Sequence, residues 1–202
     1  MEPSIFNPGE PHKSVESKIA VSLERVAEAI RVLLWNEAKG HGLTPIQMQL
    51  LIFLAFHPEK QRKVSYLAQE FNLTKATISD AVKILLQKGL VMKADDLADS
   101  RSYSLYLTPK GEELARTTSH FADSLQAPLE KLTVRQKEVF YEALLTLIHT
   151  LTKSGIITHQ RMCYTCRFYT KSKDGAYCNL LHKPLPVEAL RVDCPEHELI
   201  AR

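Results

Sequence analysis

The first 162 residues of this 202-residue chain contain no cysteine, and the whole chain has only seven glycines and ten prolines. So few glycines and prolines exclude a collagen-like or low-complexity protein. The longest apolar runs, such as Leu50 to Phe56, are too short to cross a membrane. The first residues lack the basic and apolar regions of a secretory signal peptide. We therefore expect a cytoplasmic protein that does not contact a membrane.

A large excess of charge of one sign is also missing. The chain has 26 basic and 23 acidic side chains, a net charge of +3, and 45% hydrophobic residues. This is the composition of an ordinary globular protein. Because the net charge is so small, any contact with nucleic acid has to come from the local placement of basic residues.

The chain divides into three segments of different character. Residues 1–14 contain Pro3, Pro8 and Pro11, which predicts a loosely ordered arm. Residues 15–155 contain a series of helical apolar patterns, whereas residues 156–202 show no helical period and hold all four cysteines. We expect residues 15–155 to form the main domain. The last segment is too short to bury much of a core, so it needs a cross-link or a metal.

Capping residues divide the main segment into helices. Thr44 to Gln47 form a capping box, and Thr74 is expected to cap a helix over residues 75–88. A shorter helix over residues 66–71, capped by Ser65, comes before it. Only a three-residue turn separates these two helices, which is the spacing of a helix-turn-helix.

Strands and further helices complete the pattern. Residues 90–93 and 103–107 alternate as two strands around a polar loop. Helices are expected over residues 110–125, from Val134 to about Lys153, and from Val15 to Gly40. The order of elements predicts a mainly α fold with a small β-hairpin, the α+β arrangement of a winged helix.

Several motifs in this order resemble the MarR (multiple antibiotic resistance regulator) family. The resemblance covers roughly residues 15–153 and rests on Leu67-Ala68 to Leu73-Thr74, Ala76-Thr77-Ile78-Ser79 to Val82, Gly89-Leu90-Val91, Asp99-Ser100-Arg101 and Leu105 to Gly111. It implies a dimeric winged helix-turn-helix protein that binds double-stranded DNA and regulates transcription. We expect it to act as a repressor. The family lacks the cysteine-containing extension, so the resemblance says nothing about residues 156–202.

The helix over residues 75–88 is the expected recognition helix. Its outward side chains would reach base edges in the major groove, whereas Ile78, Val82 and Leu85 would pack inward. The predicted DNA-contacting residues here are Lys75, Thr77, Ser79, Asp80 and Lys83. Asp80 departs from the family, which often has a basic residue at that position. The alternative is a plain amphipathic helix with a solvated face.

The loop between the two strands is the expected wing. An arginine at a wing tip enters a narrow minor groove, where the negative potential is enhanced, and we assign this role to Arg101. Asp99 would orient Arg101 through a charge-assisted hydrogen bond. The alternative is a solvated pair of side chains that contributes little.

The first and last long helices of the main segment each carry an apolar stripe. Such helices intertwine to form the dimer in the resembled family. A symmetric dimer requires a pseudo-palindromic operator with half-sites about 34 Å apart. The alternative is that these helices only cover the core of one protomer.

The four cysteines predict a metal site. Cys163 and Cys166 form a C-x2-C pair, with Cys178 and Cys194 as the third and fourth ligands. Zinc is the first expectation, with His182 or His197 as alternative ligands in place of Cys178 or Cys194. A [4Fe–4S] cluster also takes four cysteines and is the second. Free thiols or a disulfide switch are the third. Nearby basic residues, Arg161 among them, would offset the negative charge of the site.

These features together predict a transcription regulator with a metal module and not an enzyme, with no catalytic residue assigned. A thiol oxidoreductase that uses Cys163 and Cys166, or an adaptor that binds another protein through its tail, are the alternatives. No βαβ pattern surrounds the C-x2-C pair, which disfavours the oxidoreductase. The sequence does not define the operator, the regulated genes or any small-molecule effector.

Overall fold

The computed structural model describes residues 4–7, 14–96, 99–158, 160–173 and 175–200. In the wing, residues 95–96 and 99–102 are described by their backbone alone. Within the described residues, no helix is both long enough and apolar enough to span a membrane.

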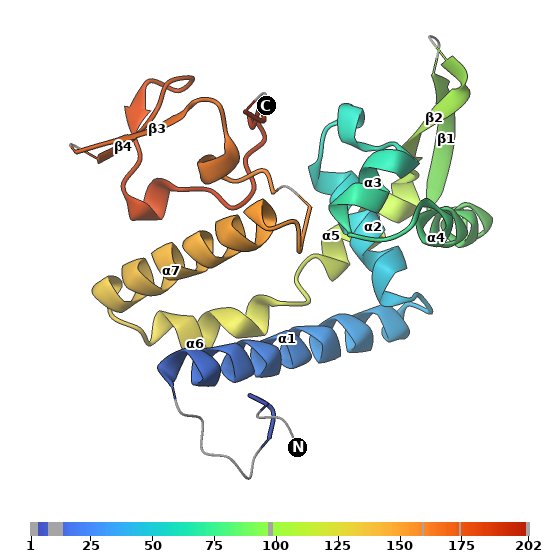
Figure 1. Ribbon diagram of the computed structural model, residues 1–202. Coiled ribbons are helices and arrows are strands. Elements are labelled where there is room, and N and C mark those ends of the chain that lie inside the picture. Colours follow the sequence, from blue (N-terminus) through green and yellow to red (C-terminus); the bar gives the residue numbers. More distant parts are fainter. Residues whose placement is uncertain (1–3, 8–13, 97–98, 159, 174, 201–202) are drawn as a thin grey trace.

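The main segment contains seven α-helices among the described residues, and a hairpin lies between the fourth and the fifth (Figure 1). The helices are α1 (Val15–Gly40), α2 (Pro45–Phe56), α3 (Val64–Glu70), α4 (Lys75–Gln87), α5 (Pro109–Thr118), α6 (Gln126–Glu130) and α7 (Val134–Lys153). The strands are β1 (Val91–Asp96) and β2 (Asp99–Leu107), and the 3-10 turns are η1 (Glu59–Gln61) and η2 (Asp123–Leu125). The mainly helical winged-helix architecture is therefore confirmed.

The last segment folds as a small module without α-helix among its described residues. Its strands are β3 (Tyr169–Ser172), β4 (Gly175–Cys178) and β5 (Lys183–Pro184), and its 3-10 turns are η3 (Cys163–Thr165) and η4 (Val187–Ala189). The strands form one antiparallel sheet in the order β3-β4-β5. We call residues 160–200 the cysteine module.

One hydrophobic core belongs to the winged helix. The helix α2 is mostly apolar and lies at its centre, with Met48, Leu50 and Leu51 fully buried. Leu67 from α3, Ile78 and Leu85 from α4 and Leu105 from β2 complete the buried cluster. Because α3 and α4 share this core, the relative orientation of the two helices of the helix-turn-helix is fixed.

A second core joins the cysteine module to α7. Leu145 of α7 is buried with Met162, Leu185 and Leu190 of the module, and Tyr141 packs beside them. The Tyr141 hydroxyl donates a hydrogen bond of 2.8 Å to the Leu190 carbonyl. The module thus covers one face of α7.

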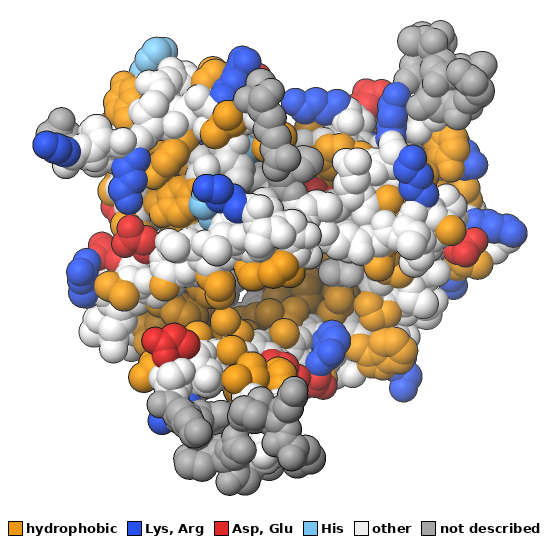
Figure 2. Space-filling model, viewed as in Figure 1, with side chains coloured by type: hydrophobic (Ala, Val, Ile, Leu, Met, Phe, Trp, Pro, Cys, Tyr) orange, Lys and Arg blue, Asp and Glu red, His pale blue; other side chains and the backbone are white. Residues whose placement is uncertain are grey.

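The long helices leave apolar surface uncovered. In α1 the buried residues are Leu34 and Ala38, and in α7 the one buried residue is Leu145. The exposed hydrophobic side chains are Val15, Ile19, Val26, Ile30, Val32 and Trp35 on α1, and Val134, Val139, Phe140 and Leu147 on α7. Figure 2 shows hydrophobic side chains around a hollow between α1 and α7. These helices do not bury their stripes within one protomer.

Two expected helix boundaries are wrong. The helix α3 begins at Val64, and Ser65 is inside it and not at its cap. The helix expected over residues 110–125 ends at Thr118, after which η2 and α6 follow as separate short turns. After Thr118 the backbone hydrogen bonds change from the α-helical spacing to three-residue turns: the Phe121 N–H donates to the Thr118 carbonyl at 3.2 Å, and the Asp123 N–H donates to the His120 carbonyl at 3.0 Å.

Candidate nucleic-acid interface and cysteine module

The helix α4 has the two faces that a recognition helix requires. Ile78, Val82 and Leu85 are buried, as predicted. The side chains that the structure leaves exposed include Lys75, Thr77, Ser79, Asp80 and Lys83. Thr74 caps the helix by accepting a hydrogen bond of 3.1 Å from the Thr77 backbone N–H. The polar N-terminal half of α4 is therefore free to meet a groove of DNA.

The turn between α3 and α4 is tightly held. Asn72 adopts a left-handed conformation with φ of 52°, and the Leu73 N–H donates to the Ala68 carbonyl at 2.9 Å. Asparagine tolerates this backbone conformation better than most residues. The Asn72 side chain also accepts a hydrogen bond of 2.8 Å from the Thr158 N–H, in the segment that leaves α7.

The wing is an antiparallel hairpin with Val91 paired to Leu107 at its base. The Leu105 N–H donates to the Arg62 carbonyl at 3.1 Å, which joins β2 to the loop before α3. The Lys93 ammonium lies 4.1 Å from the centroid of the Tyr103 ring. Asp99 and Arg101 belong to β2 by their backbone, and their side chains lie outside the described part of the structure.

The cysteine module brings all four cysteines into one small fold, and none of them forms a disulfide. Cys163 and Cys166 lie at the two ends of the η3 turn, where the Cys166 N–H donates to the Cys163 carbonyl at 3.0 Å. Cys178 ends β4. Arg191 contacts two of the sulfurs: its backbone N–H donates to Cys163 Sγ at 3.2 Å, and its guanidinium lies 3.7 Å from Cys194 Sγ.

The sulfurs have not converged on one centre. Among the described residues, no three His, Cys, Asp or Glu side chains are grouped closely enough to hold a metal ion. Burial raises the pKa of the Cys163 thiol and of the Cys194 thiol above the ordinary value.

The two alternative ligands have different surroundings. His182 is exposed and has a positive φ of 50°. His197 is partly buried, and its Nε2 lies 2.9 Å from the Thr165 hydroxyl. Neither histidine is grouped with cysteines in a metal-holding set within the described residues.

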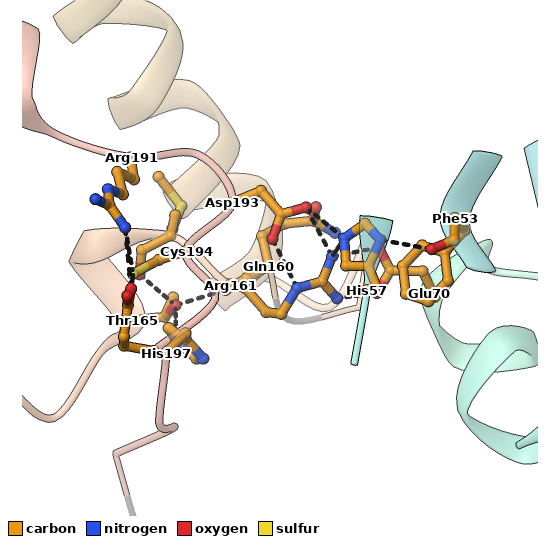
Figure 3. A network of polar contacts seen from close by, with 12 residues as sticks. Phe53, His57, Glu70, Gln160, Arg161, Thr165, Arg191, Asp193, Cys194 and His197 are labelled. Atoms are coloured by element: carbon orange, nitrogen blue, oxygen red, sulfur yellow. Dashed lines mark hydrogen bonds and ion pairs between the residues drawn. The ribbon is translucent and has the colours of Figure 1, made fainter. Parts of the chain in front are cut away.

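A buried arginine connects the module to the winged helix (Figure 3). Arg161 is 8% exposed, and its guanidinium donates to both oxygens of Asp193 at 2.7 and 2.9 Å. It also donates to both oxygens of Glu70 at the end of α3, and to the Tyr66 hydroxyl at 2.9 Å. Burial by itself would lower the pKa of Arg161, but these hydrogen bonds raise it above the ordinary value.

Two further contacts complete this network, which we call the Arg161 junction. His57 follows α2, stacks on Phe53 with ring centroids 3.7 Å apart, and places Nε2 2.9 Å from Asp193 Oδ2. The hydrogen bond to His57, together with the hydrogen bonds and positive charge of Arg161, holds the pKa of the Asp193 carboxyl well below its usual range. Sequence reasoning assigned Arg161 only a general charge-balancing role, because partners 91 residues away leave no periodic signal.

Known proteins that are similar to this chain agree with its winged-helix fold. Residues 41–102 match the MarR family. The HTH-type transcriptional repressor YetL of Bacillus subtilis is 24% identical over 137 residues, which is 67% of this chain and 81% of YetL. The MarR family regulator Sco3205 of Streptomyces coelicolor, solved in complex with DNA, is 25% identical with a TM-score of 0.58. That match covers 72% of this chain and 93% of Sco3205.

A MarR protein from Peptoclostridium difficile has the same fold, with a TM-score of 0.62 and 21% identity over 72% of this chain and 94% of that one. The fold is that of a winged helix, with the polar face of α4 exposed. The family match covers residues 41–102, and the relatives YetL and Sco3205 are transcriptional regulators.

Proposed function

We propose that this protein is a homodimeric transcriptional repressor that binds a pseudo-palindromic operator. The observation that carries the proposal is α4, whose exposed N-terminal half presents polar side chains beside the wing while its other face is buried. Lys75, Thr77, Ser79, Asp80 and Lys83 would meet the major groove, and Asp99 and Arg101 would lie at the minor groove. A repressor acts by occupying the promoter, and the relative YetL is named as one.

The uncovered helices supply the argument for a dimer. Apolar stripes on α1 and α7 face solvent in one protomer. A second copy of the chain carries the same two stripes, so the two protomers would bury these stripes against each other. A two-fold axis through these helices would present two α4 helices to one face of a duplex. The operator then needs two half-sites about one helical turn apart.

Titration of the protein against genomic DNA fragments at moderate salt tests this function. We expect tight binding to a few fragments and binding to the remainder that is about 1000-fold weaker, since specific complexes exceed non-specific ones by at least that factor. Equal, weak binding to every fragment would contradict the proposal.

Replacing Arg101 with alanine should weaken operator binding more than tenfold. The reason is loss of the cation that we place in the minor groove, where the potential is most negative. Electrophoretic mobility shifts with the selected fragment measure the change, and light scattering checks that the variant stays dimeric. Arg135→Ala is the matched control, because Arg135 lies at the start of α7, at the end farther from the wing (Figure 1). Unchanged affinity in Arg101→Ala would remove the wing from the mechanism.

We infer in addition that Cys163, Cys166, Cys178 and Cys194 bind one thiophilic metal centre, zinc or a [4Fe–4S] cluster. Four free thiols in a module with little core of its own support this assignment. The Arg191 N–H directed at Cys163 Sγ is the kind of hydrogen bond that stabilises a metal-bound thiolate. Metal binding would bring the sulfurs closer together and would displace the thiol protons, because the thiolate is the form of cysteine that binds metal.

Metal analysis and optical spectra of anaerobically purified protein test the site. A colourless protein with about one zinc per chain indicates zinc, and a broad brown absorbance indicates a cluster. Cys178→Ser should lose most of the metal, whereas His182→Ala should keep it. Metal-free wild-type protein would refute the metal centre, and loss of metal in His182→Ala would move that ligand to the histidine.

A further inference from the structure

The short helix α3 is held on two faces by different parts of the chain. Leu67 and Ala68 are buried in the core of the winged helix. On another face, Tyr66 and Glu70 lie one turn apart, and both accept hydrogen bonds from Arg161 of the cysteine module. Because α3 has only seven residues and no side-chain cap at its start, it depends on tertiary contacts for its position.

The Arg161 guanidinium fixes α3 against the module (Figure 3). Its Nε and Nη2 donate to the two oxygens of Asp193. Its Nη1 donates to Glu70 Oε2 at 2.5 Å and to the Tyr66 hydroxyl at 2.9 Å, and Nη2 donates to Glu70 Oε1 at 3.2 Å. All five N–H groups therefore have an acceptor. Because the guanidinium is planar and rigid, the two carboxylates are held in one relative position.

A second attachment lies in the turn between α3 and α4. The Thr158 N–H donates to Asn72 Oδ1 at 2.8 Å, and the Thr158 hydroxyl donates to the Gln69 carbonyl at 2.7 Å. In the same turn the Leu73 N–H donates to the Ala68 carbonyl at 2.9 Å. The turn is thus bonded both to its own helix and to the segment that leads from α7 into the module.

These attachments leave the DNA-facing side of α4 open. The side chains of Lys75, Thr77 and Ser79 remain exposed. The contacts fall instead on Glu70, the last residue of α3, and on Asn72, in the turn before α4. Apolar packing in the core is non-directional, whereas hydrogen bonds at these two positions restrict the direction in which α4 leaves the turn.

We propose that the Arg161 junction and Thr158 position the recognition helix, so that the cysteine module takes part in operator selection. This inference rests on the proposed function of α4. The junction is complete in this structure, so its action does not depend on what the cysteines bind. Buried ion pairs add little net stability compared with apolar packing, but they can select one conformation. Positioning of this kind controls affinity for the operator and not general attachment to DNA.

The first test is Glu70→Gln, which removes one carboxylate from the junction and keeps the shape of the side chain. Loss of a negative charge would by itself strengthen attachment to DNA phosphates. We expect the opposite for the operator: affinity falls about tenfold, within the range for residues that touch no ligand. Binding to unrelated DNA at the same salt should be unchanged or slightly tighter. Glu188→Gln removes an exposed carboxylate from the η4 turn and should bind the operator as the wild type does.

The second test is Thr158→Val, which leaves the ion pairs intact. Valine has nearly the shape of threonine but lacks the hydroxyl that bonds to the Gln69 carbonyl. We expect operator affinity to fall about threefold, as for the loss of one hydrogen bond. Thr158→Ser keeps the hydroxyl and should bind as the wild type does. Combined with Glu70→Gln, the loss should exceed the product of the two single losses, because each attachment partly compensates for the other.

Hydrogen exchange shows whether the effect is local. In both single variants the Leu73 amide, whose N–H closes the turn before α4, should exchange at least about threefold faster than in the wild type. The amides of α2, in the centre of the core, should change less. Equal acceleration of Leu73 and α2 would mean a general loss of stability and would overturn the inference.

The DNA-binding outcomes separate the inference from the proposed function. Unchanged operator affinity in Glu70→Gln and in the double variant would overturn the inference and leave the regulator intact. An equal loss of affinity for operator and unrelated DNA would also overturn it. Wild-type protein that prefers no fragment contradicts the proposed function and the inference with it. Should Glu70→Gln fail to fold, equal operator affinity of Thr158→Val and Thr158→Ser would overturn the inference.

Discussion

Phe140→Glu in α7 should convert the proposed dimer to a monomer and weaken operator binding at least a hundredfold. Phe140 is 46% exposed and is not among the α7 residues that pack against the cysteine module. A glutamate buried at this position between two protomers would be an unpaired charge, which costs several kcal/mol. Loss of the second protomer removes the contacts to one half-site. These contacts account for much of the ratio between specific and non-specific DNA affinity, which is about 1000 or more.

Light scattering and operator titration of the same preparation measure both effects. Arg135→Glu is the matched control, because it also introduces a glutamate into α7, at an exposed position in the first turn. The control should remain dimeric and bind the operator as the wild type does. A dimeric Phe140→Glu with normal affinity would show that α7 does not form the interface.

The faces of α4 could be predicted from the sequence because both faces follow from local rules. A cap at Thr74 fixes where the helix begins, and the helical period then decides that Ile78 and Val82 point inward. No distant contact is needed to reach this result. The same reasoning was less successful for α7. A single apolar stripe was expected there, but Phe140 is exposed whereas Ile148 packs with Leu145 against the module.

The Arg161 junction could not be predicted from local rules. Its members come from α2, α3 and two segments of the module, and they are polar residues that sequence patterns place on the surface. The Thr158–Asn72 contact is similar, since it depends on where the chain leaves α7. The fold of the winged helix could thus be predicted from the sequence, whereas the attachment of the module could not.

The structure gives a physical reason for the motif Thr108-Pro109-Lys110-Gly111, which carries part of the family resemblance. Thr108 caps α5 by accepting from the Gly111 N–H at 3.1 Å, and its hydroxyl donates to the Gly89 carbonyl at 2.7 Å. The Thr108 N–H donates to the Leu90 carbonyl at 3.1 Å. These bonds hold the start of α5 against the backbone that connects α4 to β1, so no space remains for a side chain at position 111.

Gly111→Ala should therefore lower the free energy of unfolding by about 3 kcal/mol, at the upper end of the usual cost of overpacking. A Cβ at this position would lie 1.9 Å from the Leu90 carbonyl oxygen and 2.9 Å from its carbon. Both are backbone atoms, which cannot rotate away as a flexible side chain can. The melting temperature should fall by about 6–12 °C for a chain of this size.

Gly40→Ala is the matched control, and it tests whether the loss in Gly111→Ala comes from steric contact or from glycine chemistry in general. Gly40 ends α1, and a Cβ there would meet no atom within 4 Å. Alanine favours helix over glycine, so this variant should be as stable as the wild type or more stable by up to about 1 kcal/mol. Both variants are melted at one protein concentration, because the proposed dimerisation would make the midpoint concentration-dependent. Equal midpoints for the two variants would mean that α5 does not dock on the Leu90 carbonyl, and the wing would lose its fixed position beside α4.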